Sequence, residues 1–190
     1  MKNRNKRDGI LAAALEIIAE RGFHGSPMAM IAQKAEVASG TIYVYFKSKD
    51  ELIDQLLGEI ELVLRQAIEK GYPADGSIRQ RFFHIGASAF DYFLSHPLQF
   101  RFLQQYYNSP FGAALRRDRM SRPDSRDLVR DFFHQGIAEG ILKDIPLIIH
   151  TSTAFGPIFS IMRDHVHGLI ELDNESVNKV LESCWDAIKK

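Results

Sequence analysis

The residues best equipped for chemistry lie close together, in the run GTIYVYFKSK from Gly40 to Lys49. Its threonine, tyrosine and lysine side chains carry donors that bind phosphate oxygens, and short polar side chains also reach the edges of base pairs. Gly40 has no side chain, so it lets the backbone come close to a phosphate. This run therefore predicts binding to a nucleic acid.

The distribution of charge agrees with a polyanionic partner. The chain of 190 residues has no formal net charge, yet residues 1–49 hold eight basic residues against four acidic ones. Such a local excess is typical of nucleic-acid-binding segments, although a solvated basic tail gives the same count. Arg4, Lys6 and Arg7 are expected either to reach neighbouring phosphates as an arm or to fray in solvent.

The remaining polar residues include candidates for a metal site and for a catalytic site. Asp164, His165 and His167 are spaced like ligands, with His150 as a remote fourth. Histidines on amphipathic helices are more often solvated than ligated, and the sequence has no HExxH pattern, nucleophile elbow or phosphate-binding glycine loop. We therefore expect no metal, no cofactor and no enzymatic activity.

Composition is that of an ordinary globular chain, with 45% hydrophobic and 25% charged residues. The single cysteine, Cys184, excludes an internal disulfide and suits a reducing compartment, so we expect a cytoplasmic protein. The N-terminus lacks a signal-peptide cleavage site, and no apolar run is long enough to span a membrane. The length favours two unequal domains.

Apolar periodicity predicts an all-α fold. Two short helices, over 27–35 and 40–46, are separated by a tight turn and follow a first helix over 10–23, which is the spacing of a helix-turn-helix motif. A longer helix begins at about Lys49 with Ser48 as its cap. The other expected helices cover 77–95, 97–108, 124–140, 146–167 and 175–188, which makes about nine helices, with 109–123 unassigned.

Caps and an inner face can be assigned to the two short helices. Ser26 is the expected cap of the first helix, with Pro27 as its first residue, and Ser39 is the expected cap of the second. Ile42 and Phe46 share one face, which we expect to be buried against the preceding helices. The outward residues are then Thr41, Val44 and Tyr45, with Tyr43 at the flank.

This pattern resembles the TetR family of bacterial transcriptional regulators over about residues 4–64. The resemblance lies in ILAAALEIIAERGFHG and VASGTIYVYFKSKDELI, of which GTIYVYFKSKDEL is the most specific part. It implies an N-terminal three-helix DNA-binding domain over 4–64, with its motif at about 27–46. It also implies a C-terminal helical bundle over 65–190 for effector binding and dimerisation, and a phosphate contact from Lys49.

Some residues depart from the family pattern. Pro27 stands where serine or threonine usually opens the first helix of the motif, Met30 where a polar residue is common, and Ala38 where serine is frequent. No Arg, Asn or Gln lies within 37–46 to read purines, although Gln33 and Lys34 precede that helix. The candidate DNA contacts are Ser26, Met28, Ser39, Gly40, Thr41, Tyr43, Val44, Tyr45, Lys47 and Lys49.

A dimer surface is needed because one such motif meets only one half-site. The resemblance implies that the two C-terminal helices form it. Gly156 offers a small residue for close approach, while Val177, Leu181 and Trp185 form a stripe on the last helix. Trp185 is either an interface anchor or a core residue of one subunit.

Aromatic residues are concentrated in the second part of the chain, where eleven of the 13 phenylalanines follow residue 50. The resemblance implies a ligand pocket there, and an aromatic lining suits a hydrophobic or aromatic small molecule. Most of these rings are expected simply to pack helices together. The candidate pocket residues are Phe90, Phe93, Tyr106, Phe133, Phe155, Phe159 and Met162.

The leading prediction is a homodimeric repressor that binds a pseudo-palindromic operator in double-stranded DNA and is released by a hydrophobic or aromatic effector. Two alternatives stay open. One is a DNA-bound scaffold whose helical domain docks a protein partner, which a filled core and an exposed apolar patch would indicate. The other is a helical enzyme that modifies a small molecule.

Overall fold

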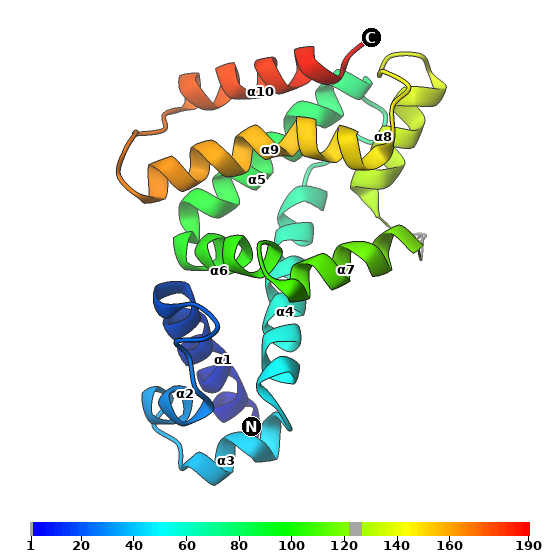
Figure 1. Ribbon diagram of the computed structural model, residues 1–190. Coiled ribbons are helices and arrows are strands. Elements are labelled where there is room, and N and C mark those ends of the chain that lie inside the picture. Colours follow the sequence, from blue (N-terminus) through cyan, green and yellow to red (C-terminus); the bar gives the residue numbers. More distant parts are fainter. Residues whose placement is uncertain (1, 122–126) are drawn as a thin grey trace. The chain divides into compact units, whose positions relative to one another are not determined.

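The computed structural model describes residues 2–121 and 127–190, and Figure 1 shows the ten helices in these ranges. The prediction of an all-α fold is confirmed. The helices are α1 (Lys2–Arg21), α2 (Met28–Lys34), α3 (Ser39–Tyr45), α4 (Lys49–Glu69), α5 (Ile78–Ser95), α6 (Pro97–Tyr107), α7 (Pro110–Ser121), α8 (Leu128–Ala138), α9 (Leu147–Val166) and α10 (Asn174–Ile188). The helix beyond the expected nine is α7, in the segment that the apolar pattern leaves unassigned.

Two helix starts differ clearly from the prediction. α1 begins at Lys2, so the polar residues before Ile10 extend it in the N-terminal direction. α8 begins at Leu128, because the Oδ1 atom of Asp127 accepts hydrogen bonds from the amides of Val129 (3.1 Å) and Arg130 (3.2 Å). A side chain that accepts these amide hydrogens fixes the first turn of a helix.

The described residues pack as two units. Unit 1 comprises residues 2–63 and 96–121, and unit 2 comprises residues 64–95 and 127–190. These packing units differ from the predicted domains over 4–64 and 65–190, since α6 and α7 pack with the N-terminal helices.

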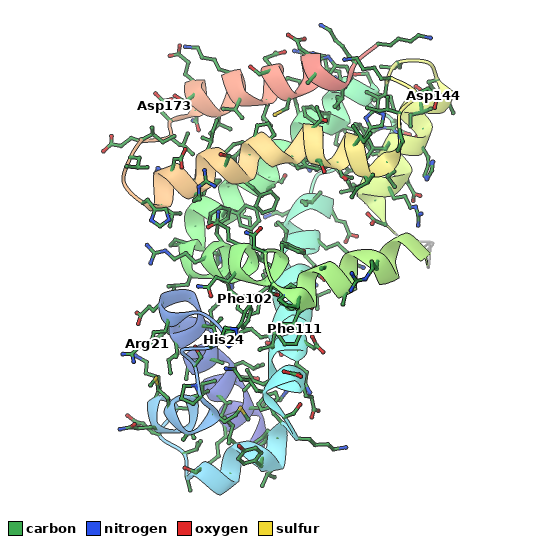
Figure 2. The ribbon with its side chains drawn as sticks, viewed as in Figure 1. Arg21, His24, Phe102, Phe111, Asp144 and Asp173 are labelled. Carbon is green, nitrogen blue, oxygen red and sulfur yellow. The ribbon has the colours of Figure 1, made fainter. Side chains whose placement is uncertain are left out.

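Phe23 connects α6 and α7 to the N-terminal helices of unit 1. Its ring makes edge-on contacts with Phe102 at 6.0 Å and Tyr106 at 6.3 Å on α6, and with Phe111 at 5.9 Å on α7. Figure 2 shows Phe102 and Phe111 beside the segment that carries His24. Edge-on aromatic contacts add stabilisation beyond the area that they bury, so this cluster holds segments far apart in the sequence in one core.

The core of unit 2 is built around α5. The ring of Phe82 contacts Phe132 at 6.2 Å, Phe155 at 6.4 Å and Trp185 at 5.6 Å. Gly86 lets α10 approach closely, because a Cβ atom there would lie 2.3 Å from a methyl group of Leu181. In Figure 1, α9 and α10 accordingly lie next to each other.

The start of α10 is capped in the way that the start of α8 is. Asp173, labelled in Figure 2, accepts a 2.8 Å hydrogen bond from the amide of Ser176. Hydrogen bonds from Ser176 hold the pKa of the Asp173 carboxyl below its ordinary value.

Among the described helices, none combines the length and the apolar character that a bilayer crossing requires.

Candidate nucleic-acid interface

The pair α2 and α3 forms a tight helix-turn-helix. Residues 35–38 separate the two helices. Within the turn, Glu36 has φ 55°, a left-handed conformation that few residues other than glycine adopt. The amide of Val37 donates to the carbonyl of Ala32 at 2.9 Å, so the chain reverses within these few residues.

The inner face of α3 is the one predicted. Ile42 and Phe46 are fully buried, which confirms their expected packing against the preceding helices. The guanidinium of Arg7 lies 5.8 Å from the centre of the Phe46 ring, so α1 contributes a cation–π contact to this packing. α3 is thus held from its inner side.

The other side of α3 is open. Val44 is 79% exposed and Tyr43 is 54% exposed, while Thr41 and Tyr45 are half-buried. A Cβ atom added to Gly40 would meet no described atom within 4 Å, so the backbone is accessible at that point. We call this surface the outer face of α3; it consists of Ser39, Gly40, Thr41, Tyr43, Val44 and Tyr45.

Two predicted DNA contacts are wrong because they are buried. Ser26 is fully buried, and its hydroxyl donates a 2.6 Å hydrogen bond to the carbonyl of Gly22 at the end of α1. It does not cap α2, whose N-cap is Pro27 without a side-chain hydrogen bond. Met28 is also buried, on the inner face of α2.

The structure confirms the predicted cap of α4 but not the predicted cap of α3. Ala38 is the N-cap of α3 and has no side-chain hydrogen bond, so Ser39 is the first exposed residue of the helix and not its cap. Ser48 is confirmed as the cap of α4, since its hydroxyl accepts from the amide of Glu51 at 3.1 Å. Glu51 in turn accepts from the amide of Lys47 at 2.8 Å, which completes a reciprocal capping arrangement.

Lys49 is engaged inside unit 1. Its ammonium donates a hydrogen bond to the backbone carbonyl of Phe23, and burial lowers the pKa of this lysine from its ordinary value. An ammonium carries three donors, and this bond uses one of them. Lys47, two residues earlier, is exposed.

Arg7 does not belong to an N-terminal arm, so the expectation is wrong for this residue. Its two terminal nitrogens donate to Glu59 at 2.5 Å and Gln55 at 2.7 Å, both on α4, which ties α1 to α4. Lys6 is exposed, and the side chain of Arg4 lies outside the described residues.

Gln33 and Lys34 on α2, which precede the helix that lacks purine-reading side chains, are both exposed. Lys34 forms an ion pair with Glu16 at 2.7 Å, and the hydrogen bond to Glu16 raises the pKa of Lys34. Of the two, Lys34 is therefore already paired with a carboxylate on α1.

The predicted pocket residues are not all brought together. Tyr106 lies in unit 1, whereas the others lie in unit 2, where Phe93 contacts Phe159 at 5.6 Å and Phe133 contacts Phe155 at 6.0 Å. A groove of about 480 Å³ in unit 2 contains none of the seven predicted residues. Its lining consists of Tyr72, Ala74, Arg81, Leu128, Asp131, Phe132 and Gln135.

The residues considered for metal binding have other partners. His165 lies 3.2 Å from the carbonyl of Ile170, and the neighbouring Asp164 pairs with Arg163 at 3.3 Å. His150 is fully buried, with its Nε2 atom 2.7 Å from the carbonyl of Lys143. Within 2–121 and 127–190, no three histidine, cysteine or acidic side chains are grouped to hold a metal ion.

Two predicted interface residues belong to the core of unit 2. Leu181 is fully buried against Gly86, and Trp185 is buried against Phe82, so the core alternative for Trp185 holds. Neither side chain is therefore available to a dimer surface. Gly156 is exposed and Val177 is half-buried.

One positioning contact has no signal in the sequence. The side-chain amide of Gln105 on α6 donates to the carbonyl of Ala19 near the end of α1 at 3.3 Å. These residues are 86 positions apart. By contrast, the serine and glutamate of the capping arrangement at α4 are a recognisable local pattern.

Comparison with known protein families accounts for nearly the whole chain. Residues 10–56 match the family of bacterial regulatory proteins, tetR family. Residues 58–190 match the tetracyclin repressor-like C-terminal domain.

Individual relatives agree with these matches. An uncharacterized HTH-type transcriptional regulator of Haemophilus influenzae is 26% identical over 186 residues, covering 95% of this chain and 94% of that protein. The fatty acid metabolism regulator protein of Bacillus subtilis is 47% identical over 58 residues, 30% of each chain. The crystal structure of a tetR family transcription regulator from Shewanella sp. PV-4 has a TM-score of 0.84 and 26% identity, covering 97% of this chain and 98% of that one.

Proposed function

Since the chain belongs to the TetR family of bacterial transcriptional regulators, we propose that it is a homodimeric repressor released from its operator by a hydrophobic or aromatic small molecule. The observation that carries the DNA-binding part is the outer face of α3, which is exposed while the opposite side of the helix is buried. A helix held in this way can enter a major groove without unfolding its own domain. We also propose a cytoplasmic location, because a bacterial regulator meets its operator there.

The chemistry of the outer face favours hydroxyl and methyl contacts. Hydroxyl groups of Ser39, Thr41 and the two tyrosines donate to phosphates, while methyl groups of Thr41 and Val44 suit the methyl group of thymine. Because α3 has no Arg, Asn or Gln, we propose that the shape and deformability of the operator supply much of the specificity. The proposed contacts are Ser39, Gly40, Thr41, Tyr43, Val44, Tyr45, Lys47 and Lys49.

Lys47 and Lys49 are expected to act differently on DNA binding. Lys47→Ala removes an exposed charge. The slope of log affinity against log salt should therefore become shallower by about 0.9, with unchanged stability. Lys49→Ala should lower the slope similarly and also destabilise unit 1 by about 1–3 kcal/mol, since the Phe23 carbonyl loses its donor. Fluorescence anisotropy at several salt concentrations and denaturant unfolding measure both quantities. An unchanged slope in Lys49→Ala would restrict this residue to the structural role.

For the dimer surface we propose the exposed side of α9. Ile149, Ser152 and Gly156 follow one another at spacings of three and four, so they share one face of the helix, and all three are exposed. A Cβ atom on Gly156 would meet no atom of the described chain within 4 Å, which leaves room for a helix of a second copy. The half-buried Val177 on α10 completes the proposed surface.

The proposed effector site lies among the aromatic side chains of unit 2. The ring of His150 is 5.0 Å from that of Phe133, and its Nδ1 atom is buried without a hydrogen-bond partner among the described residues. A buried acceptor of this kind is costly unless something donates to it. It supports an effector that combines an apolar body with one N–H or O–H group. We propose no catalytic activity for this site.

Selection of binding sites from random double-stranded DNA tests the proposed function. A dimer should enrich two inverted half-sites with centres about one helical turn or a multiple apart. Enrichment of single half-sites, or of no sequence at all, would contradict the proposal.

A scaffold that docks a protein partner is the second candidate function. The ring contacts that fill the core of unit 2 favour it, and so do the exposed Leu169 and Ile170 after α9. A small molecule that releases the selected operator from the purified protein would decide for the effector-controlled repressor.

A further inference from the structure

Unit 1 contains a groove of about 460 Å³ between α4 and the α6–α7 segment. It lies within the DNA-binding unit and is separate from the aromatic residues proposed above for the effector. Its lining combines acidic, aromatic and aliphatic side chains: Asp54, Leu57, Gly58, Glu61, Tyr106, Phe111, Ala114 and Leu115.

Two aromatic rings give the groove an apolar floor. Tyr106 and Phe111 are stacked with ring centres 6.4 Å apart and an angle of 29° between their planes. Leu57 and Leu115 extend the apolar lining. An ammonium group is attracted to the faces of such rings, so this floor accepts a cation as well as an uncharged apolar group.

The charges in the groove distinguish between these ligands. Asp54 and Glu61 are seven residues apart on α4, so they share one face of the helix, and both line the groove. Tyr107 donates a 2.8 Å hydrogen bond to Glu61, and Tyr106 bonds to Asp54. Partial burial raises the pKa of the Asp54 carboxyl, and the charge of Asp50 adds to this rise, so a cation placed here would relieve an unfavourable charge.

Gly58 keeps the space between the two carboxylates open. It lies in the interior of α4, where glycine costs about 1 kcal/mol relative to alanine. A Cβ atom built on it would meet no described neighbour within 4 Å, so close packing of a helix does not require a glycine here. The absent side chain instead enlarges the groove from which Asp54 and Glu61 can be reached.

We propose that this groove binds a small organic cation in which an ammonium group is attached to an aromatic or branched apolar body. The ammonium lies at the carboxylate of Asp54, with that of Glu61 about two helical turns further along the groove, and the apolar body rests on Tyr106 and Phe111. The charge complementarity of the two carboxylates selects this occupant over a neutral or anionic one.

The groove is connected to the residues that hold the DNA-binding motif. Tyr106 and Phe111 both contact the ring of Phe23. The backbone carbonyl of Phe23 accepts a hydrogen bond from the ammonium of Lys49. Lys49 opens α4 only a few residues after α3 ends. A ligand that rests on these two rings is therefore two contacts away from a proposed phosphate-binding lysine.

Titration of the DNA-free, full-length protein with benzylammonium and with benzyl alcohol tests the proposal, because the two probes have similar shapes and differ in charge. NMR signals of the methyl groups of Leu57, Ala114 and Leu115 report on the groove. We expect benzylammonium to shift these signals and to bind at least about tenfold more tightly than the alcohol. Equal affinities, or shifts confined to other methyl groups, would overturn the proposal.

Three variants locate the site. Asp54→Asn should weaken benzylammonium binding about tenfold, whereas Glu69→Gln, which removes a charge from α4 outside the groove, should leave it unchanged. Gly58→Leu should abolish binding by filling the space, while Gly58→Ala should retain it. Unchanged helicity by circular dichroism shows that each variant is folded. Binding that survives in Gly58→Leu would overturn the assignment. The titration needs neither operator nor effector, so its result is independent of the repressor proposal.

Discussion

Replacement of Trp185 by alanine is expected to lower the free energy of unfolding by about 3–5 kcal/mol, the usual cost of deleting a large buried aromatic side chain. Trp185 is only 6% exposed, and its ring lies 5.6 Å from that of Phe82 at the centre of unit 2. Removing the indole would therefore leave a cavity between α10 and α5. Urea unfolding followed by circular dichroism measures the loss.

A matched pair of variants separates the core from the dimer surface. Trp185→Phe keeps most of the ring contact, so it should cost clearly less than Trp185→Ala. Gly156→Leu changes the exposed side of α9 and should weaken the dimer in analytical ultracentrifugation, with little effect on the stability of the subunit. If Trp185→Ala instead dissociated the dimer with unchanged subunit stability, its assignment to the core would be wrong.

Replacement of Val44 by glutamate is expected to reduce operator affinity about hundredfold or more. Because Val44 is 79% exposed, the change should leave stability within about 0.5 kcal/mol of the wild type. The new carboxylate would stand on the proposed DNA-binding face, where like charges cost several kcal/mol. Fluorescence anisotropy with the selected operator measures the affinity.

Leu62→Glu provides the control for Val44→Glu. Leu62 is 51% exposed on α4 and takes no part in the proposed DNA surface, so the same added charge should change operator affinity only slightly. A comparable loss in both variants would mean that net charge alone governs binding. Undiminished affinity in Val44→Glu would remove the outer face of α3 from the interface.

Local patterns were sufficient to predict most of the helices. The inner face of α3 follows from the spacing of Ile42 and Phe46, and the start of α4 follows from a capping serine with a glutamate three residues later. α7 lacks an equally clear apolar stripe, and the cap at Asp127 sets a later start for α8 than the breaks near proline indicate.

Predictions for the candidate site are wrong where a side chain can bond to either of two neighbouring backbone segments, or where its partner is distant in the sequence. Ser26 stands both after α1 and before α2, and its hydroxyl bonds to the carbonyl of Gly22 behind it instead of an amide ahead of it. Periodicity predicts that Trp185 faces something apolar, but it does not indicate whether that surface belongs to the same subunit or to another. The placement of Tyr106 depends on its contact with Phe23, 83 positions earlier in the chain.

The composition of unit 1 from two separate segments has a consequence for biosynthesis. Phe23 can find Phe102, Tyr106 and Phe111 only after these residues have left the ribosome, and the whole of 64–95 is made in between. Closing that long loop carries an entropic cost which the aromatic contacts repay only at the end. A nascent chain that stops at residue 63 would thus expose the ring of Phe23. The complete DNA-binding unit forms only once α7 has been translated.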